Sequence, residues 1–97
     1  MTHLFAVRRG RGPAWKPAAP LEDQPLWAEH AAFMDALHDE GVVVAAGPLE
    51  EVSAALVIMR AKDAAECARR LAEDPWGPDM LATAEIALWT VRIGNIC

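Results

Sequence analysis

Cysteine is scarce in this chain, and long apolar runs are missing. Cys67 and Cys97 are too few for a disulfide framework, and neither has a His or Cys neighbour at the spacing of a zinc site. We therefore expect two reduced thiols, no metal and no cofactor. No apolar stretch approaches the ~20 residues that a membrane-spanning helix needs, so we expect no association with a membrane.

Basic residues are also few, with 9 Lys and Arg against 14 Asp and Glu and a net charge of −5. A nucleic-acid-binding face needs clustered Lys and Arg to neutralise phosphates, so no nucleic-acid partner is expected. The one basic cluster comprises Arg8, Arg9, Arg11 and Lys16, and it is either a solvated strand end or a contact for an anionic substrate. The arginines also interrupt the N-terminal apolar stretch too early for a signal peptide, and we expect a cytoplasmic protein.

The chain is short but rich in apolar residues. Its 97 residues predict a single domain, 1–97, which at this size buries ~60 to 65% of the surface that the unfolded chain exposes. Yet 54% of the residues are hydrophobic, and the mean hydropathy is positive. Spare apolar surface in such a chain indicates a partner subunit, so we expect a homodimer.

The stretch from Leu26 to Leu49 predicts the central unit of the fold. Its first half carries apolar residues at helical spacing, with His30 near the middle of the buried stripe. Gly41 is suited to end this helix. The apolar segment from Val42 to Ala46, which begins with three β-branched valines, predicts a buried strand. Gly47-Pro48 then removes a backbone donor, so the strand either ends there or lies at an edge of the sheet.

The rest of the chain predicts further strands over 3–9, 53–60 and 83–93 and a second helix over 63–73. Between residues 10 and 25, two glycines and four prolines exclude regular structure. A connection this long in a small domain is typically a lid or a binding loop. Trp15 in this loop either packs the loop against the domain or stacks on a substrate.

The element order β-α-β-β-α-β predicts an α+β, ferredoxin-like fold. In that fold a four-stranded antiparallel sheet carries both helices on one face. The strands, however, are apolar on both faces: Ile86 and Leu88 alternate with Ala87 and Trp89 in the last one. Two helices cannot cover two faces, so we expect the open face to pack on the same face of a second copy.

This topology brings distant residues to one end of the domain. The end of the first strand (Arg8 and Arg9), the start of the first helix, the end of the second strand and the end of the second helix should meet there. An inward-facing His30 and the Asp74 carboxylate could then form a pair in which Asp74 fixes the imidazole tautomer and raises its basicity, as acid–base catalysis requires.

Each of these residues also has a purely structural interpretation. Asp74 before Pro75 is a common cap of a short turn, and a single His on an apolar stripe is often a core residue. Trp76 would be either the wall of an apolar pocket or part of the core. Gly47 would either allow a ligand to approach the backbone closely or simply end a strand.

Three motifs, in this order, resemble the YCII-related family, a branch of the dimeric α+β barrel proteins. They are the helix segment Glu29 to Gly41, the tetrapeptide Ala46-Gly47-Pro48-Leu49 and the tripeptide Asp74-Pro75-Trp76. The resemblance implies a ferredoxin-like protomer, a dimer, and an active-site His and Asp, which are His30 and Asp74 here. It also implies lyase-like chemistry on chlorinated aromatic compounds for some relatives, and isomerase or cofactor-free oxygenase activity for others in the superfamily. The Pro-rich segment 10–25 departs from the family pattern.

These observations predict a small enzyme that acts on a small organic molecule. His30 would be the acid–base and Asp74 its partner, in a proton abstraction followed by elimination or isomerisation. The alternative is a non-catalytic ligand-binding or structural dimer, with His30 in a closed core and Asp74 as a cap. The residues expected to bind the substrate are Arg8, Trp27, Gly47, Pro48, Pro75 and Trp76.

Overall fold

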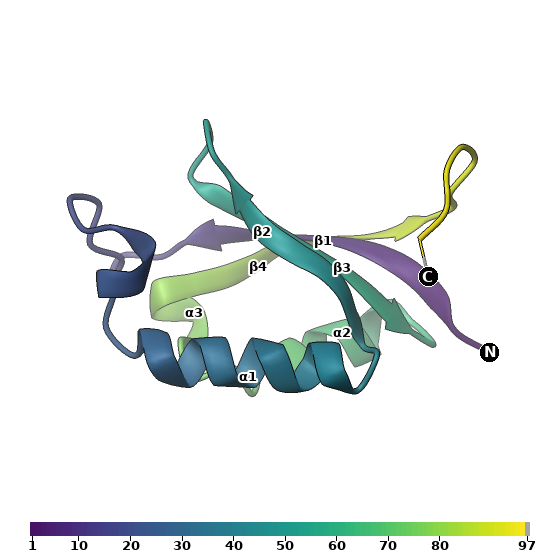
Figure 1. The fold of residues 1–97 in the computed structure, drawn as a ribbon, viewed down its shortest axis with the longest axis horizontal. Helices are drawn as coiled ribbons and strands as arrows, with labels where there is room; N and C mark the ends of the chain where they lie inside the picture. The colour runs from purple at the N-terminus through teal and green to yellow at the C-terminus, as the bar shows by residue number, and fades with distance from the viewer. Residues whose placement is uncertain (97) are drawn as a thin grey trace.

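The computed structural model describes residues 1–96, so the prediction for Cys97 lies outside the described residues. The strands are β1 (His3–Arg11), β2 (Val43–Leu49), β3 (Ala54–Ala61) and β4 (Leu81–Trp89), and they form one antiparallel sheet in the order β2-β3-β1-β4. The helices α1 (Trp27–Asp39), α2 (Ala64–Leu71) and α3 (Gly77–Met80) lie on one side of this sheet (Figure 1). The predicted ferredoxin-like α+β fold is confirmed.

The ends of both long helices follow from local chemistry. Gly41 adopts a left-handed backbone (φ 81°) just after α1, as a residue without a Cβ does at little steric cost. At the start of α2, the side chain of Asp63 accepts a hydrogen bond from Glu66 N at 2.8 Å, as predicted for an N-cap. Gly41 thus marks where α1 ends before β2, and Asp63 marks where α2 begins after β3.

Several expected boundaries shift in the structure. β2 continues through Gly47 and Pro48 to Leu49, and of the two predicted alternatives the edge position is the right one. An edge strand tolerates Pro48 because one side of its backbone needs no partner strand. The second helix ends at Leu71, the last strand covers Leu81–Trp89 rather than 83–93, and the short helix α3 is an element that the sequence did not predict. The prediction that residues 10–25 hold no regular structure is wrong at two places, because β1 extends to Arg11 and a short 3-10 helix covers Leu21–Asp23.

The sheet has one covered face and one open face. The covered face packs against α1 and α2, with Val7, Val57 and Met59 almost fully buried. Over residues 1–96 no helix is long and apolar enough to cross a membrane. Strand pairing places Ala6 opposite both Ile58 and Ala87 on the open face.

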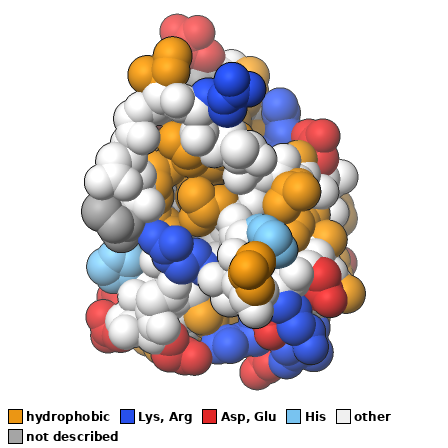
Figure 2. Space-filling model, turned by 90° about the vertical axis from the view of Figure 1, so that its right-hand side faces the viewer, with side chains coloured by type: hydrophobic (Ala, Val, Ile, Leu, Met, Phe, Trp, Pro, Cys, Tyr) orange, Lys and Arg blue, Asp and Glu red, His pale blue; other side chains and the backbone are white. Residues whose placement is uncertain are grey.

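Three exposed apolar side chains lie in or after the last residues of β4. Leu88 and Ile93 are 65% and 95% exposed, and Trp89 is 37% exposed. Seen from the end where both termini lie, hydrophobic side chains are visible within a hollow of the surface (Figure 2).

Candidate functional site

His30 and Asp74 form a buried hydrogen-bonded pair. His30 lies in the first turns of α1 and is 8% exposed, and the Asp74 side chain has no exposed surface. Nδ1 of His30 lies 2.9 Å from each carboxylate oxygen. An ionised carboxylate can only accept, so Nδ1 donates and the lone pair of the neutral ring is on Nε2. The predicted pairing is confirmed, while its catalytic role stays a prediction.

Asp74 is held in its charged form by three donors. Burial raises the pKa of this carboxyl, but the hydrogen bonds from His30, the Trp76 backbone and Arg9 outweigh burial and leave the pKa below its usual value. Trp76 N donates to Oδ1 at 2.9 Å, which is the turn-capping contact expected of an Asp before Pro75. Asp74 is therefore both a cap and the partner of His30, and the two interpretations are compatible.

The basic partner of Asp74 is Arg9, whereas Arg8, which we expected to bind the substrate, lies on the opposite face of the sheet. Arg9 Nη1 donates to Asp74 Oδ2 at 2.7 Å, and Nη2 donates to the carbonyl oxygen of Leu81 at 3.1 Å. Arg8 is exposed and pairs in the sheet with Leu56 and Glu85 on the open face. Successive side chains of a strand point to opposite faces, so two adjacent arginines cannot both reach the site.

Aromatic rings surround the imidazole. The Trp76 ring stacks on His30, with centroids 3.8 Å apart and planes 8° apart, and the Trp27 ring lies 6.0 Å from both. The indole nitrogen of Trp76 donates to the carbonyl oxygen of Pro25 at 2.6 Å. Among residues 1–96 Nε2 of His30 has no hydrogen-bond partner, and it is not among the fully buried unpaired atoms. The ring is therefore held by its Nδ1 edge and by one face, and Nε2 keeps some accessible surface.

An open cavity of about 610 Å³ lies beside this pair. Of the predicted site residues, His30, Trp27, Gly47, Pro48 and Trp76 line it. Pro75 is exposed and does not line it, because only the neighbouring Asp74 and Trp76 turn inward. The remaining lining residues include Arg9, Arg11 and Trp15, for which the sequence left a substrate contact open. They also include Leu21, Glu22, Met34, Glu50 and Val57, which the sequence did not assign to the site.

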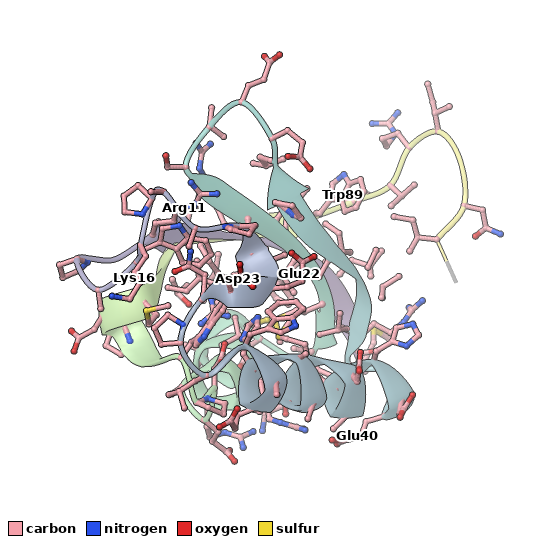
Figure 3. The ribbon with its side chains drawn as sticks, turned by 60° about the vertical axis from the view of Figure 1, so that its left-hand side comes forward. Arg11, Lys16, Glu22, Asp23, Glu40 and Trp89 are labelled. Atoms are coloured by element: carbon pink, nitrogen blue, oxygen red, sulfur yellow. The ribbon has the colours of Figure 1, made fainter. Side chains whose placement is uncertain are left out.

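The loop between β1 and α1 supplies one wall of the cavity. Gln24 is buried and holds the loop through bonds with both backbone groups of Lys16 and with the carbonyl oxygen of Ala19. Within the loop the short 3-10 helix η1 (Leu21–Asp23) carries Glu22, and Figure 3 shows Glu22 and Arg11 at the same end of the molecule.

Trp15 fixes this loop to the rest of the site. It is 9% exposed and meets Trp76 edge to face at 5.2 Å, and the Arg11 guanidinium lies 4.7 Å above its ring. The predicted anchoring role of Trp15 is thus confirmed, and the same ring also lines the cavity.

The sequence could not show which arginines of β1 point toward the site. Arg9 and Arg11 follow Phe5 and Val7 at a spacing of two, which is the period of the covered face of β1. Leu4 and Ala6 are apolar as well, so the sequence showed no alternation from which to choose the inward set.

Metal-binding chemistry has no evident set of ligands here. Within the described part of the chain, no three His, Cys, Asp or Glu side chains are grouped closely enough to hold a metal ion. What the arrangement can do with its own groups is accept or donate a proton at His30 Nε2, next to a cavity of the size that small organic ligands occupy.

A comparison with protein-family models gives a match. The family model of the YCII-related domain matches residues 14–90, a segment that includes the loop, His30 and Asp74. A search of curated proteins gives no match.

Proposed function

Because the chain belongs to the YCII-related family, we propose that it binds a small organic molecule in the cavity beside His30 and acts on it by acid–base chemistry. One observation carries the proposal: Nδ1 of His30 is occupied by Asp74, while Nε2 has no partner among residues 1–96 and its ring lines the cavity. A histidine that served only the core would be enclosed by packing rather than placed at a cavity wall.

The reaction class follows from what a neutral His30 ring can do at Nε2. In the neutral ring Nε2 can remove a proton from a carbon next to a carbonyl group, and the electrons of that C–H bond become an enolate. The enolate then either takes a proton back at another carbon, which is isomerisation, or expels a leaving group with its electron pair, which is elimination. The Asp74 carboxylate and the stacked Trp76 ring both favour the positive charge that His30 gains in the first step.

The aromatic and aliphatic residues that line the cavity favour a small apolar ring system. Trp15, Trp27 and Trp76 contribute aromatic surface, and Met34 and Val57 add aliphatic surface. Large flat side chains recognise flat apolar ligands by contact area and stacking.

The proposal can be tested with 1-indanone, a flat ring ketone with exchangeable protons next to its carbonyl. In D₂O the protein should accelerate deuterium uptake at that carbon, as followed by proton NMR. His30→Gln should reduce the acceleration by about 10² to 10⁴, the usual contribution of a positioned acid–base group.

A matched pair of glycine variants tests the cavity itself. A Cβ at Gly47 or at Gly10 would meet no atom within 4 Å, but only Gly47 lines the cavity. Gly47→Val should fold normally and weaken 1-indanone binding, whereas Gly10→Val should fold and bind as the unaltered protein does. If 1-indanone does not bind, the proposal fails. Binding without exchange would favour the alternative, a non-catalytic ligand-binding protein.

A further inference from the structure

Arg9 contacts the His30–Asp74 pair through the Asp74 carboxylate. Its side chain is 3% exposed, and its terminal nitrogens reach Asp74 Oδ2 and the Leu81 carbonyl oxygen. Arg9 Nε is buried and has no partner in the described part of the chain. Burying a guanidinium with an unpaired donor costs stability, and a buried ion pair is often no better than apolar packing. Stability alone therefore does not explain Arg9.

The three side chains form one charge system. The Arg9 guanidinium and the Asp74 carboxylate cancel each other, so the cluster has no net charge when His30 is neutral and carries one positive charge when His30 is protonated. Oδ2 of Asp74 lies 2.7 Å from Arg9 and 2.9 Å from His30, which brings the two basic groups within range of mutual repulsion. An Asp alone would instead favour the imidazolium, which has no free lone pair.

We propose that Arg9 is a positioning residue that turns the His30–Asp74 pair into a triad and keeps His30 neutral, with its proton on Nδ1 and Nε2 free to act as a base. The catalytic meaning of this inference rests on the proposed function, but the protonation state of His30 can be read without any substrate. Arg9 acts through Asp74 and fixes the carboxylate so that both oxygens face Nδ1.

The other charged groups around His30 are not placed to keep it neutral as Arg9 does. Those that line the cavity are Arg11 at the end of β1, Glu22 on the loop and Glu50 after β2, and no ion pair links any of them to His30 within residues 1–96. Their opposite charges face a cavity open to solvent, where screening weakens their effect. Arg9 and Asp74 are the charged groups in the buried interior of the site.

The test is ¹⁵N NMR of the His30 ring at pH 7, in the absence of any ligand. The unaltered protein should show a protonated Nδ1 and an unprotonated Nε2. In Arg9→Gln the ratio of imidazolium to neutral imidazole at fixed pH should rise at least about tenfold, because a nearby positive charge has been removed. Arg9→Lys keeps the charge and should restore the neutral ring.

Arg8→Gln is the matched control, because it removes the same charge from the adjacent, exposed residue of β1. It should leave the His30 ring signals unchanged. A folded Arg9→Gln protein with unchanged His30 signals overturns the proposal. A protonated His30 ring at pH 7 in the unaltered protein or in Arg9→Lys also overturns the proposal. These two measurements decide the question even if Arg9→Gln does not fold. Failure of 1-indanone to bind would count against the proposed function alone, since these ring signals do not depend on a ligand.

Discussion

The Trp76 ring lies flat against the His30 ring, with centroids 3.8 Å apart and planes inclined by 8°. The same tryptophan donates its backbone N–H to Asp74 and its indole N–H to the carbonyl oxygen of Pro25. One residue thus contacts both members of the pair and the end of the loop that walls the cavity. Changes to the loop or to the Asp74 carboxylate should therefore alter the position of the His30 ring.

Asp74 should make the stability of the protein depend on acid pH. Its folded pKa is lowered, because the donors around it outweigh burial. Its contribution is therefore fully present above the ordinary carboxyl pKa of about 4 and is lost as the pH falls through the lower folded value. Asp74→Asn removes this dependence and leaves Arg9 buried without a counter-ion, at a cost of about 3 to 5 kcal/mol at pH 7.

Urea unfolding at neutral and acid pH measures both effects. In the unaltered protein the free energy of unfolding should drop between neutral and strongly acid pH more than in Asp74→Asn. Asp79→Asn makes the same substitution at an exposed site and should follow the unaltered protein. Superimposed pH curves for all three proteins would show that the Asp74 interactions contribute nothing to stability.

Gly12 should be essential for the close packing of the loop between β1 and α1 against α3. Its N–H donates to the carbonyl oxygen of Met80 at 3.0 Å, and the following Ala14 N–H donates to that of Asp79 at 2.8 Å. A Cβ at Gly12 would collide with the backbone of Pro78 and Asp79. Gly12→Ala should therefore cost about 1 to 3 kcal/mol and lift the loop from α3.

Limited proteolysis between residues 12 and 25 would report this opening, and a change in the tryptophan fluorescence of the protein would accompany it. Gly10→Ala is the control, because a Cβ at Gly10 has open space. A loop that remains equally resistant to protease in Gly12→Ala would mean that the close approach is not required.

The Cys67 thiol should react slowly in the native protein. Its side chain is fully buried in the core, and burial, followed by the negative charges of Glu66 and Asp63, raises its pKa. Both effects reduce the thiolate that reacts with disulfide reagents. In Cys97→Ser, which leaves Cys67 as the single thiol, labelling should proceed at the rate of unfolding and become fast in denaturant. Rapid labelling without denaturant would show that α2 opens independently.

The parts of the molecule that were predictable are those set by local chemistry. Gly41 and Asp63 mark their helix ends by backbone freedom and by capping, and the element order then fixes the topology and brings His30 and Asp74 together. The sequence could not predict which of Arg8 and Arg9 points into the site, because β1 carries apolar residues on both faces and so does not show which face is buried. The course of the loop was equally hidden, because Gln24 and Trp15 hold it through contacts that no short-range pattern encodes.

The open face of the sheet should pair two chains. Ala6 lies near its middle, opposite Ile58 and Ala87, so this part of the face is apolar, and the helices lie on the other side (Figure 1). We expect light scattering at micromolar concentration to give about twice the 10.5 kDa of one chain, since an apolar face of this kind is costly to leave in water. Ala6→Glu places a charge where the two faces would meet and should give a monomer. Val52→Glu, on the exposed turn after β2, should remain a dimer. A single 10.5 kDa species for the unaltered chain would remove the argument and would mean that the face tolerates exposure.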